Sequence, residues 1–189
     1  MKVLLINGSP NEKGCTYTAL AEVAASLNKE GIETEIFHGA DASEENVAAA
    51  AEKVEEAGGL VVGAPVYWAS PAGECVLFMD KLAGKAGEYL AHKPAAAVTS
   101  ARRSGTVSTL DVLYKYFLYY QMPIVSAFNW TMVHGNTPEE VEKDVEGLQI
   151  MRVLGQNMAW LLKSIDLGRK AGLKEPVLEE ERLWTNFIR

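Results

Sequence analysis

The chain has 189 residues, 48% of them hydrophobic and 23% charged, which is the composition of a soluble globular protein of one domain. Its net charge of -7 argues against nucleic acid as a partner and, less strongly, against an anionic membrane, because both attract basic surfaces. No apolar run has the length of a membrane span, so we expect a cytoplasmic protein without a membrane span.

Short apolar segments typical of buried strands alternate with helical patterns along the whole chain. The expected strands are Lys2–Ile6, Thr34–Phe37, Leu60–Ala64, Ala95–Thr99 and Pro123–Ala127. The expected helices are Thr16–Glu30, a helix capped by Ser43 that stops at Gly58-Gly59, Gly73–Leu82, Thr106–Tyr120, and a long helix that opens on the capping box Thr137-Pro138-Glu139-Glu140. This alternation predicts an α/β domain with a doubly wound, five-stranded parallel sheet and helices on both faces.

The domain is expected to span residues 1–165. Residues 166–189 have no strong hydrophobic period, so we expect a mostly irregular C-terminal tail that packs on a neighbouring subunit.

The loop after the first strand, GSPNEKGCTYTAL at residues 8–20, is longer than a plain turn needs to be. Ligands of open parallel sheets bind at the carboxyl ends of the strands, and the N–H groups of a helix N-terminus suit a phosphate. Hydroxyl and amide donors are added by Ser9, Asn11, Thr16 and Thr18. From its residues alone the loop is either a phosphate cradle or a helix cap.

The sequence lacks the residues that several other kinds of phosphate-binding, catalytic and metal site require. The spacing of Gly8 and Gly14 is not that of a P-loop, and G-x-G-x-x-G is absent. Neither cysteine, Cys15 or Cys75, is followed by the arginine that a cysteine phosphatase needs, and a phospho-acceptor's carboxylates are missing. The two cysteines form no disulfide framework, and no Cys or His pair has metal-ligand spacing.

Two further loops on the expected ligand side are unusual. The loop APVYWASPAG at residues 64–73 carries Tyr67 and Trp68, which offer flat faces to a planar ligand or pack in the core or against a subunit. The loop TSARRSGT at residues 99–106 carries Arg102 and Arg103, which suit an anion or an electron-rich ring edge, or are solvated surface groups. His134 is a candidate proton donor to which we assign no role.

Three motifs lie in order on these loops: Gly8-Ser9-Pro10 with Gly14-Cys15-Thr16, then Pro65-Val66-Tyr67-Trp68, then Arg102-Arg103-Ser104-Gly105. Over residues 1 to about 164 the sequence resembles the NADPH-dependent FMN reductase family of flavodoxin-like proteins, which includes the multimeric flavodoxins. The closing TNFIR is also similar. The resemblance implies a flavodoxin-like strand order 2-1-3-4-5 and noncovalent FMN.

The resemblance also implies roles for individual residues. Ser9, Asn11, Cys15, Thr16 and Thr18 would hold the phosphate, with Tyr17 nearby, and Pro65, Val66, Tyr67, Trp68, Ser100, Arg102, Arg103 and Gly105 would contact the isoalloxazine ring. The family often has Asn where this chain has Cys15, so the contact made by that side chain stays open. The compact cysteine cluster of iron–sulfur relatives is missing here, so we expect no cluster and no metal.

The implied activity is that of an FMN-dependent oxidoreductase, in which NADPH or NADH reduces the flavin and a small acceptor such as a quinone reoxidises it. No side chain is expected to act as a catalytic acid or base. We expect a homodimer or homotetramer, with Trp130 or the tail reaching a neighbour's site. The alternatives are an electron carrier that passes single electrons to proteins, which the uncharged and basic flavin loops disfavour, and a scaffold that has lost flavin.

Overall fold

The computed structural model describes residues 1–185. Residues 186–189, which are the end of the expected tail and the last four positions of TNFIR, lie outside the described residues.

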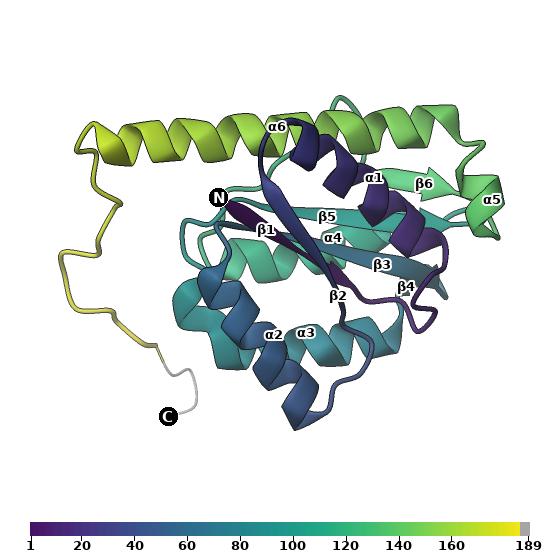
Figure 1. The fold of residues 1–189 in the computed structure, drawn as a ribbon. Coiled ribbons are helices and arrows are strands. Elements are labelled where there is room, and N and C mark those ends of the chain that lie inside the picture. The colour runs from purple at the N-terminus through teal and green to yellow at the C-terminus, as the bar shows by residue number, and fades with distance from the viewer. Residues whose placement is uncertain (186–189) are drawn as a thin grey trace.

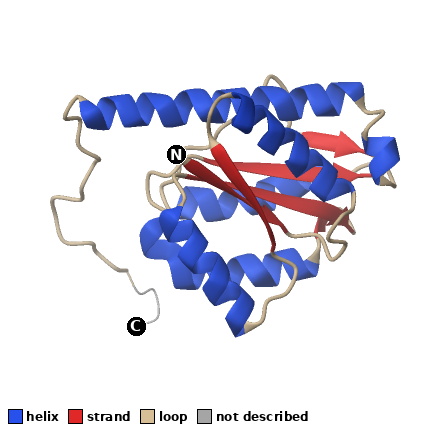
Figure 2. Cartoon of the chain, viewed as in Figure 1, coloured by secondary structure: helices blue, strands red, loops and turns tan. Residues whose placement is uncertain are grey.

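A parallel sheet forms the centre of the molecule (Figures 1 and 2). Its strands are β1 (Lys2–Asn7), β2 (Glu33–His38), β3 (Gly59–Tyr67), β5 (Ala95–Ala101) and β6 (Met132–His134), in the order β2-β1-β3-β5-β6. The two-residue strand β4 (Ser70–Pro71) pairs antiparallel with the end of β3. The five parallel strands have the expected flavodoxin-like order, which confirms the predicted fold class.

Helices cover both faces of the sheet. They are α1 (Cys15–Lys29), α2 (Glu44–Glu56), α3 (Gly73–Ala86) with the 3-10 turn η1 (Gly87–Tyr89), α4 (Thr106–Tyr119), α5 (Pro138–Val141) and α6 (Val145–Lys170). Figure 1 shows α1 and α6 on one face and α2, α3 and α4 on the other. Each face buries its own apolar cluster, since alternate residues of each strand point to opposite sides.

Helices α1 and α6 approach each other closely where two small residues meet. A side chain at Gly155 would place its Cβ 2.6 Å from Cβ of Ser26, so only glycine allows this approach. The hydroxyl of Ser26 donates to the carbonyl oxygen of Arg152 at 2.7 Å. This contact packs the long α6 against α1, whose N-terminus lies at the candidate site described below.

The expected fifth strand at Pro123–Ala127 is wrong. This segment touches the sheet through a single bridge, Ile124 to Ala95, and the chain then leaves the sheet. It returns as β6, where the backbone N–H of Thr99 donates to Thr131 O at 3.0 Å. Between the two contacts a loop exposes Phe128 and Trp130.

The expected long helix is broken into α5 and α6. The hydroxyl of Thr137 caps α5 as predicted, but α5 ends at Val141, and Asp144 then starts α6 by accepting from Gly147 N at 2.9 Å. Helix α6 continues to Lys170, across the domain boundary expected at residue 165, so the irregular tail starts at Ala171. Over residues 1–185 no helix has the length and apolarity needed to cross a membrane.

An ion-pair cluster on β2 yields the first prediction. The Glu35 carboxylate lies 2.6 Å from Nζ of both Lys2 and Lys53, and these contacts lower its pKa. A lowered pKa in the folded state stabilises the fold above the unfolded-state value of about 4.3, and this stabilisation is lost as the pH falls through the folded-state value. We expect Glu35→Gln to cost about 0.5–1 kcal/mol at neutral pH, because the cluster is partly exposed.

Urea unfolding at neutral pH and again below pH 4 tests this prediction, since the difference from wild type should shrink at the lower pH. Glu33→Gln, an exposed position on the same strand, is the control and should change little at either pH. An equal loss for Glu35→Gln at both pH values would contradict the electrostatic origin.

Candidate functional site

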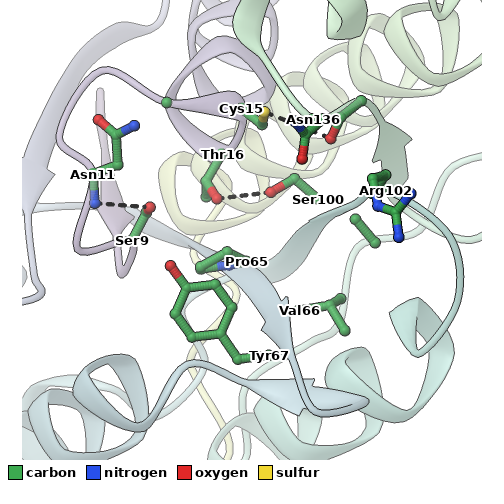
Figure 3. A pocket seen from close by; sticks show the side chains of 13 residues that line it. Ser9, Asn11, Cys15, Thr16, Pro65, Val66, Tyr67, Ser100, Arg102 and Asn136 are labelled. Carbon is green, nitrogen blue, oxygen red and sulfur yellow. Dashed lines mark hydrogen bonds between the residues drawn. The ribbon is translucent and has the colours of Figure 1, made fainter.

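A pocket of about 280 Å³ opens at the carboxyl ends of the parallel strands (Figure 3). It is lined by Ser9, Asn11, Gly14, Cys15, Thr16, Pro65, Val66, Tyr67, Ser100, Ala101, Arg102, Gly135 and Asn136. These residues come from four segments: the β1–α1 loop with the start of α1, the end of β3, the end of β5, and the β6–α5 loop. The sheet order reverses between β1 and β3, and such a reversal is where ligands bind in this class of fold.

Buried hydrogen bonds hold the β1–α1 loop in place. The Asn7 side chain accepts from Ser9 N at 3.2 Å and donates to Glu12 O at 2.9 Å. Nε2 of His38, at the end of β2, donates to Ser9 O at 2.8 Å. The hydroxyl of Ser9 accepts from Asn11 N. The loop is therefore preorganised by Asn7 and His38, two positions that the sequence analysis did not single out.

The N-terminus of α1 points into the pocket without a cap. Gly14 is its N-cap residue and offers no side chain, and the first turn contains no acidic residue. In contrast, α2, α5 and α6 each have a capping side chain and an acidic residue in the first turn. The first N–H groups and the positive end of the helix dipole are thus open to a ligand, an arrangement that favours an anion.

Two hydroxyls and a thiol lie at this helix end. The Thr16 and Ser100 side chains are buried and their oxygens are 2.9 Å apart, which ties α1 to β5 beneath the pocket. The thiol of Cys15 lies 3.7 Å from Gly135 O and donates to it. Burial raises the pKa of Cys15, with a smaller contribution from Glu140, so this thiol is neutral at physiological pH.

The β3–β4 connection is a strained two-residue turn. Trp68 and Ala69 have φ of 53° and 58°, as a type I′ hairpin turn requires, although this turn usually takes Asn and Gly. The hydroxyl of Ser108 donates to Ala69 O at 2.8 Å. Gly105, with φ of 92°, packs so closely that an added Cβ would lie 2.6 Å from Cα of Ala69. The start of α4 thus holds the turn beside the pocket.

The structure brings nine of the fourteen residues expected from the sequence to the pocket wall: Ser9, Asn11, Cys15, Thr16, Pro65, Val66, Tyr67, Ser100 and Arg102. The other five do not line it. The ring of Tyr17 lies under the Lys13 ammonium at 3.8 Å, Thr18 bonds back to Gly14, and Arg103 is exposed. Trp68 is fully exposed at the tip of the turn, and Gly105 supports that turn from behind.

Four further residues line the pocket. Gly14 and Ala101 lie within the first motif and within the loop at residues 99–106 that the sequence singles out, whereas Gly135 and Asn136 come from the β6–α5 loop and were not expected. The loop reaches the pocket because it follows β6, the last strand of the sheet. The sequence predicts the last strand at Pro123–Ala127 and therefore does not place Gly135 and Asn136 at the end of a strand. His134 precedes this loop and pairs with Asp144, 3.7 Å from Nδ1 to Oδ2, outside the pocket wall.

Comparison with known proteins identifies relatives of this chain. The sequence model of the family described as NADPH-dependent FMN reductase matches residues 1–137. An iron–sulfur flavoprotein of Methanocaldococcus jannaschii is 30% identical over 191 aligned positions, covering 87% of this chain and 99% of the relative.

Solved structures share the fold at low identity. A flavodoxin from the domain Archaea superposes with a TM-score of 0.67 at 16% identity, covering 86% of this chain and 99% of that chain. The flavoenzyme NAD(P)H:(acceptor) oxidoreductase FerB from Paracoccus denitrificans gives 0.66 at 14% identity, with 86% and 97% covered.

Proposed function

This chain belongs to the NADPH-dependent FMN reductase family, and on that premise we propose that it is an oxidoreductase that binds FMN noncovalently in the pocket and reduces a small acceptor with electrons from a nicotinamide. The observation that carries the proposal is the uncapped α1 N-terminus, surrounded by neutral donors at the point where the sheet order reverses.

The pocket residues fit the chemistry of a flavin monophosphate. A phosphate monoester accepts hydrogen bonds, and the α1 end offers backbone N–H groups together with the side chains of Ser9, Asn11 and Thr16. A planar ring needs flat, largely apolar walls, which the end of β3 supplies through Pro65, Val66 and Tyr67. The donors and the apolar walls lie on opposite sides of one pocket (Figure 3).

The protein binds and orients the flavin and the two substrates, and FMN when bound supplies the hydride and electron chemistry. Arg102, which lines the pocket, places a positive charge where negative charge on a reduced ring would be stabilised. Tyr67 is half exposed at the rim and offers a face on which a flat donor or acceptor can stack. No described side chain at the pocket is assigned the role of acid or base.

The electron donor and acceptor are the finer part of the proposal. The exposed Arg103, which does not line the pocket, suits the 2′-phosphate of NADPH, and this favours NADPH over NADH as the donor. A quinone-like molecule is the proposed acceptor, since a planar, uncharged molecule suits the apolar wall formed by Pro65, Val66 and Tyr67. The proposed location is the cytoplasm, and the proposed assembly is a homodimer or homotetramer.

We infer that the iron–sulfur part of the relative's name does not carry over to this chain. The sequence contains only two cysteines, Cys15 and Cys75, whereas a four-cysteine cluster site needs more ligands. Cys75 is fully buried in α3 against Gly8, and burial raises its pKa to about 12, which disfavours the thiolate that iron requires.

Flavin titrations test the proposal. We expect FMN to bind with a change in its absorbance and fluorescence, and riboflavin, which lacks the phosphate, to bind roughly 100-fold more weakly because it makes no charge-assisted bonds to the α1 end. Anaerobic addition of NADPH should bleach the bound FMN, with NADH less effective, and a quinone should restore the colour. Protein that takes up no FMN would overturn the proposal. Equal affinity for FMN and riboflavin would show that the phosphate does not bind at the α1 N-terminus.

A further inference from the structure

The C-terminal arm, defined here as residues 171–185, exposes an unusual amount of apolar surface. Five large apolar side chains are between 62% and 86% exposed: Leu173, Val177, Leu178, Leu183 and Trp184. The arm has no helix or strand, and Figure 1 shows it leaving the end of α6 and running outside the body of the protein. Several large apolar side chains exposed in one short segment are typical of a surface that a partner covers.

The start of the arm is fixed. Gly172, with φ of 90°, ends α6 in a Schellman-type turn in which Leu173 N donates to Gly168 O at 2.9 Å. Arg169 then pairs with Glu175. The arm therefore leaves α6 in a defined direction, and its distal part from Val177 onward is the exposed, apolar part.

A groove between the C-terminal ends of α3 and α4 has the shape to receive such a segment. Two adjoining hollows of about 440 and 430 Å³ share Ala83, Gly84, Tyr119 and Tyr120, so they form one groove. The groove has free space above Gly84, because no atom lies within 4 Å of a Cβ placed on that residue. On α4, Leu118 is 67% exposed and Tyr119 63%, which leaves apolar surface beside the groove uncovered.

The charges of the groove match those of the arm. The groove carries Lys85 and Lys115, which have no ion-pair partner among residues 1–185, and one carboxylate, Glu88, while its other carboxylate, Asp80, accepts from the Tyr116 hydroxyl at 2.5 Å. The arm carries three consecutive acidic residues, 179–181, followed by Arg182. The distal arm from Val177 onward therefore carries three acids and one base, and the groove offers two bases and one available acid.

Within one chain the arm does not cover these surfaces. Arg182 is the arm residue that lines the groove, while Leu183 and Trp184 beside it stay exposed, and so do Leu118 and Tyr119. We propose that in the assembly the distal arm of one copy lies in the α3–α4 groove of a second copy, and the reverse, so that each copy covers the other's apolar surface. The inference rests on the homo-oligomer proposed above and assigns its interface.

Cysteine cross-linking between separately made variants tests the exchange. We expect Leu118→Cys and Leu183→Cys, each alone, to give little covalent dimer under mild oxidation, and their mixture to give at least roughly tenfold more, because docking raises the effective concentration of the two thiols. The same experiment with Leu77→Cys in place of Leu118→Cys is the matched control, since Leu77 is also more than half exposed but lies on α3 outside the groove, and it should give no dimer.

Light scattering of the wild-type chain separates this inference from the proposed homo-oligomer. A dimer or tetramer without a cross-link in the Leu118→Cys and Leu183→Cys mixture would overturn the arm exchange and leave the oligomer standing. A variant that carries both Leu118→Cys and Leu183→Cys gives the second check: an intrachain disulfide, seen as a monomer with a linked peptide, would also overturn the exchange, because the arm would then dock on its own chain. A monomeric wild type without a cross-link would overturn both.

Discussion

Cys15→Glu is expected to weaken FMN binding roughly 100-fold, about 2.7 kcal/mol, while the protein stays folded. Cys15 is the first residue of α1 and lines the pocket at the uncapped helix end. A carboxylate in the first turn is favoured by the helix dipole by about 0.3–1 kcal/mol, so the substitution should not destabilise α1. The same carboxylate would repel the phosphate of FMN and accept hydrogen bonds from the N–H groups that the phosphate needs. The substitution therefore weakens binding without weakening the fold.

Fluorescence titration with FMN measures the change, and thermal unfolding of the flavin-free protein checks the fold. Cys15→Ser is the matched control and should change the dissociation constant only slightly, because a hydroxyl replaces the thiol as a donor to Gly135 O. Binding of riboflavin should be nearly unaffected by Cys15→Glu, since it has no phosphate to repel. An unchanged affinity for FMN in Cys15→Glu would mean that the phosphate binds elsewhere.

The sequence predicts the fold well where the local pattern and the tertiary structure agree. The first strand and first helix are apolar at the positions that the sheet and α6 bury, so β1 and α1 begin and end within two residues of expectation. The prediction of the fifth strand is wrong because this segment makes only one bridge to the sheet, through the exposed Ile124, and buries Val125 at the sheet edge before the chain leaves it. The real strand has only three residues, too few to show a period.

The prediction of one long helix is wrong for a related reason. Val141, Val145 and Leu148 have helical spacing, so the pattern continues across the break. The break is made by Asp144, whose carboxylate accepts from His134 N at 2.7 Å as well as from Gly147 N. A bond to a residue ten positions away is a tertiary interaction, and no local pattern contains it.

The candidate site also has parts that the sequence predicts and parts that it does not. The α1 end and the ends of β3 and β5 could be located because parallel strands bring their following loops to one edge. The turn at Trp68 and Ala69 could not, since neither residue is typical of positive φ and packing from α4 enforces it. Trp68, an expected ring contact, is therefore fully exposed at the tip of this turn and does not line the pocket.

Gly105→Ala should test that packing with a large loss of stability, about 2–4 kcal/mol. Alanine is strained at φ of 92°, and its Cβ would lie 2.6 Å from Cα of Ala69 and 2.8 Å from Cγ1 of Val66, so the turn must move. Since Val66 and Tyr67 line the pocket, FMN affinity should fall together with stability.

Urea unfolding of the flavin-free protein measures the loss, with Gly73→Ala as the matched control. Gly73 begins α3 without positive φ, and no atom lies within 4 Å of its added Cβ, so alanine there should be neutral or stabilise by about 0.4–1 kcal/mol. Because both variants add one methyl group to the residue at or next to a helix N-cap, their difference isolates the contact with the turn. If Gly105→Ala unfolded at the same urea concentration as Gly73→Ala, α4 would not be what holds Trp68 and Ala69 in their strained conformation.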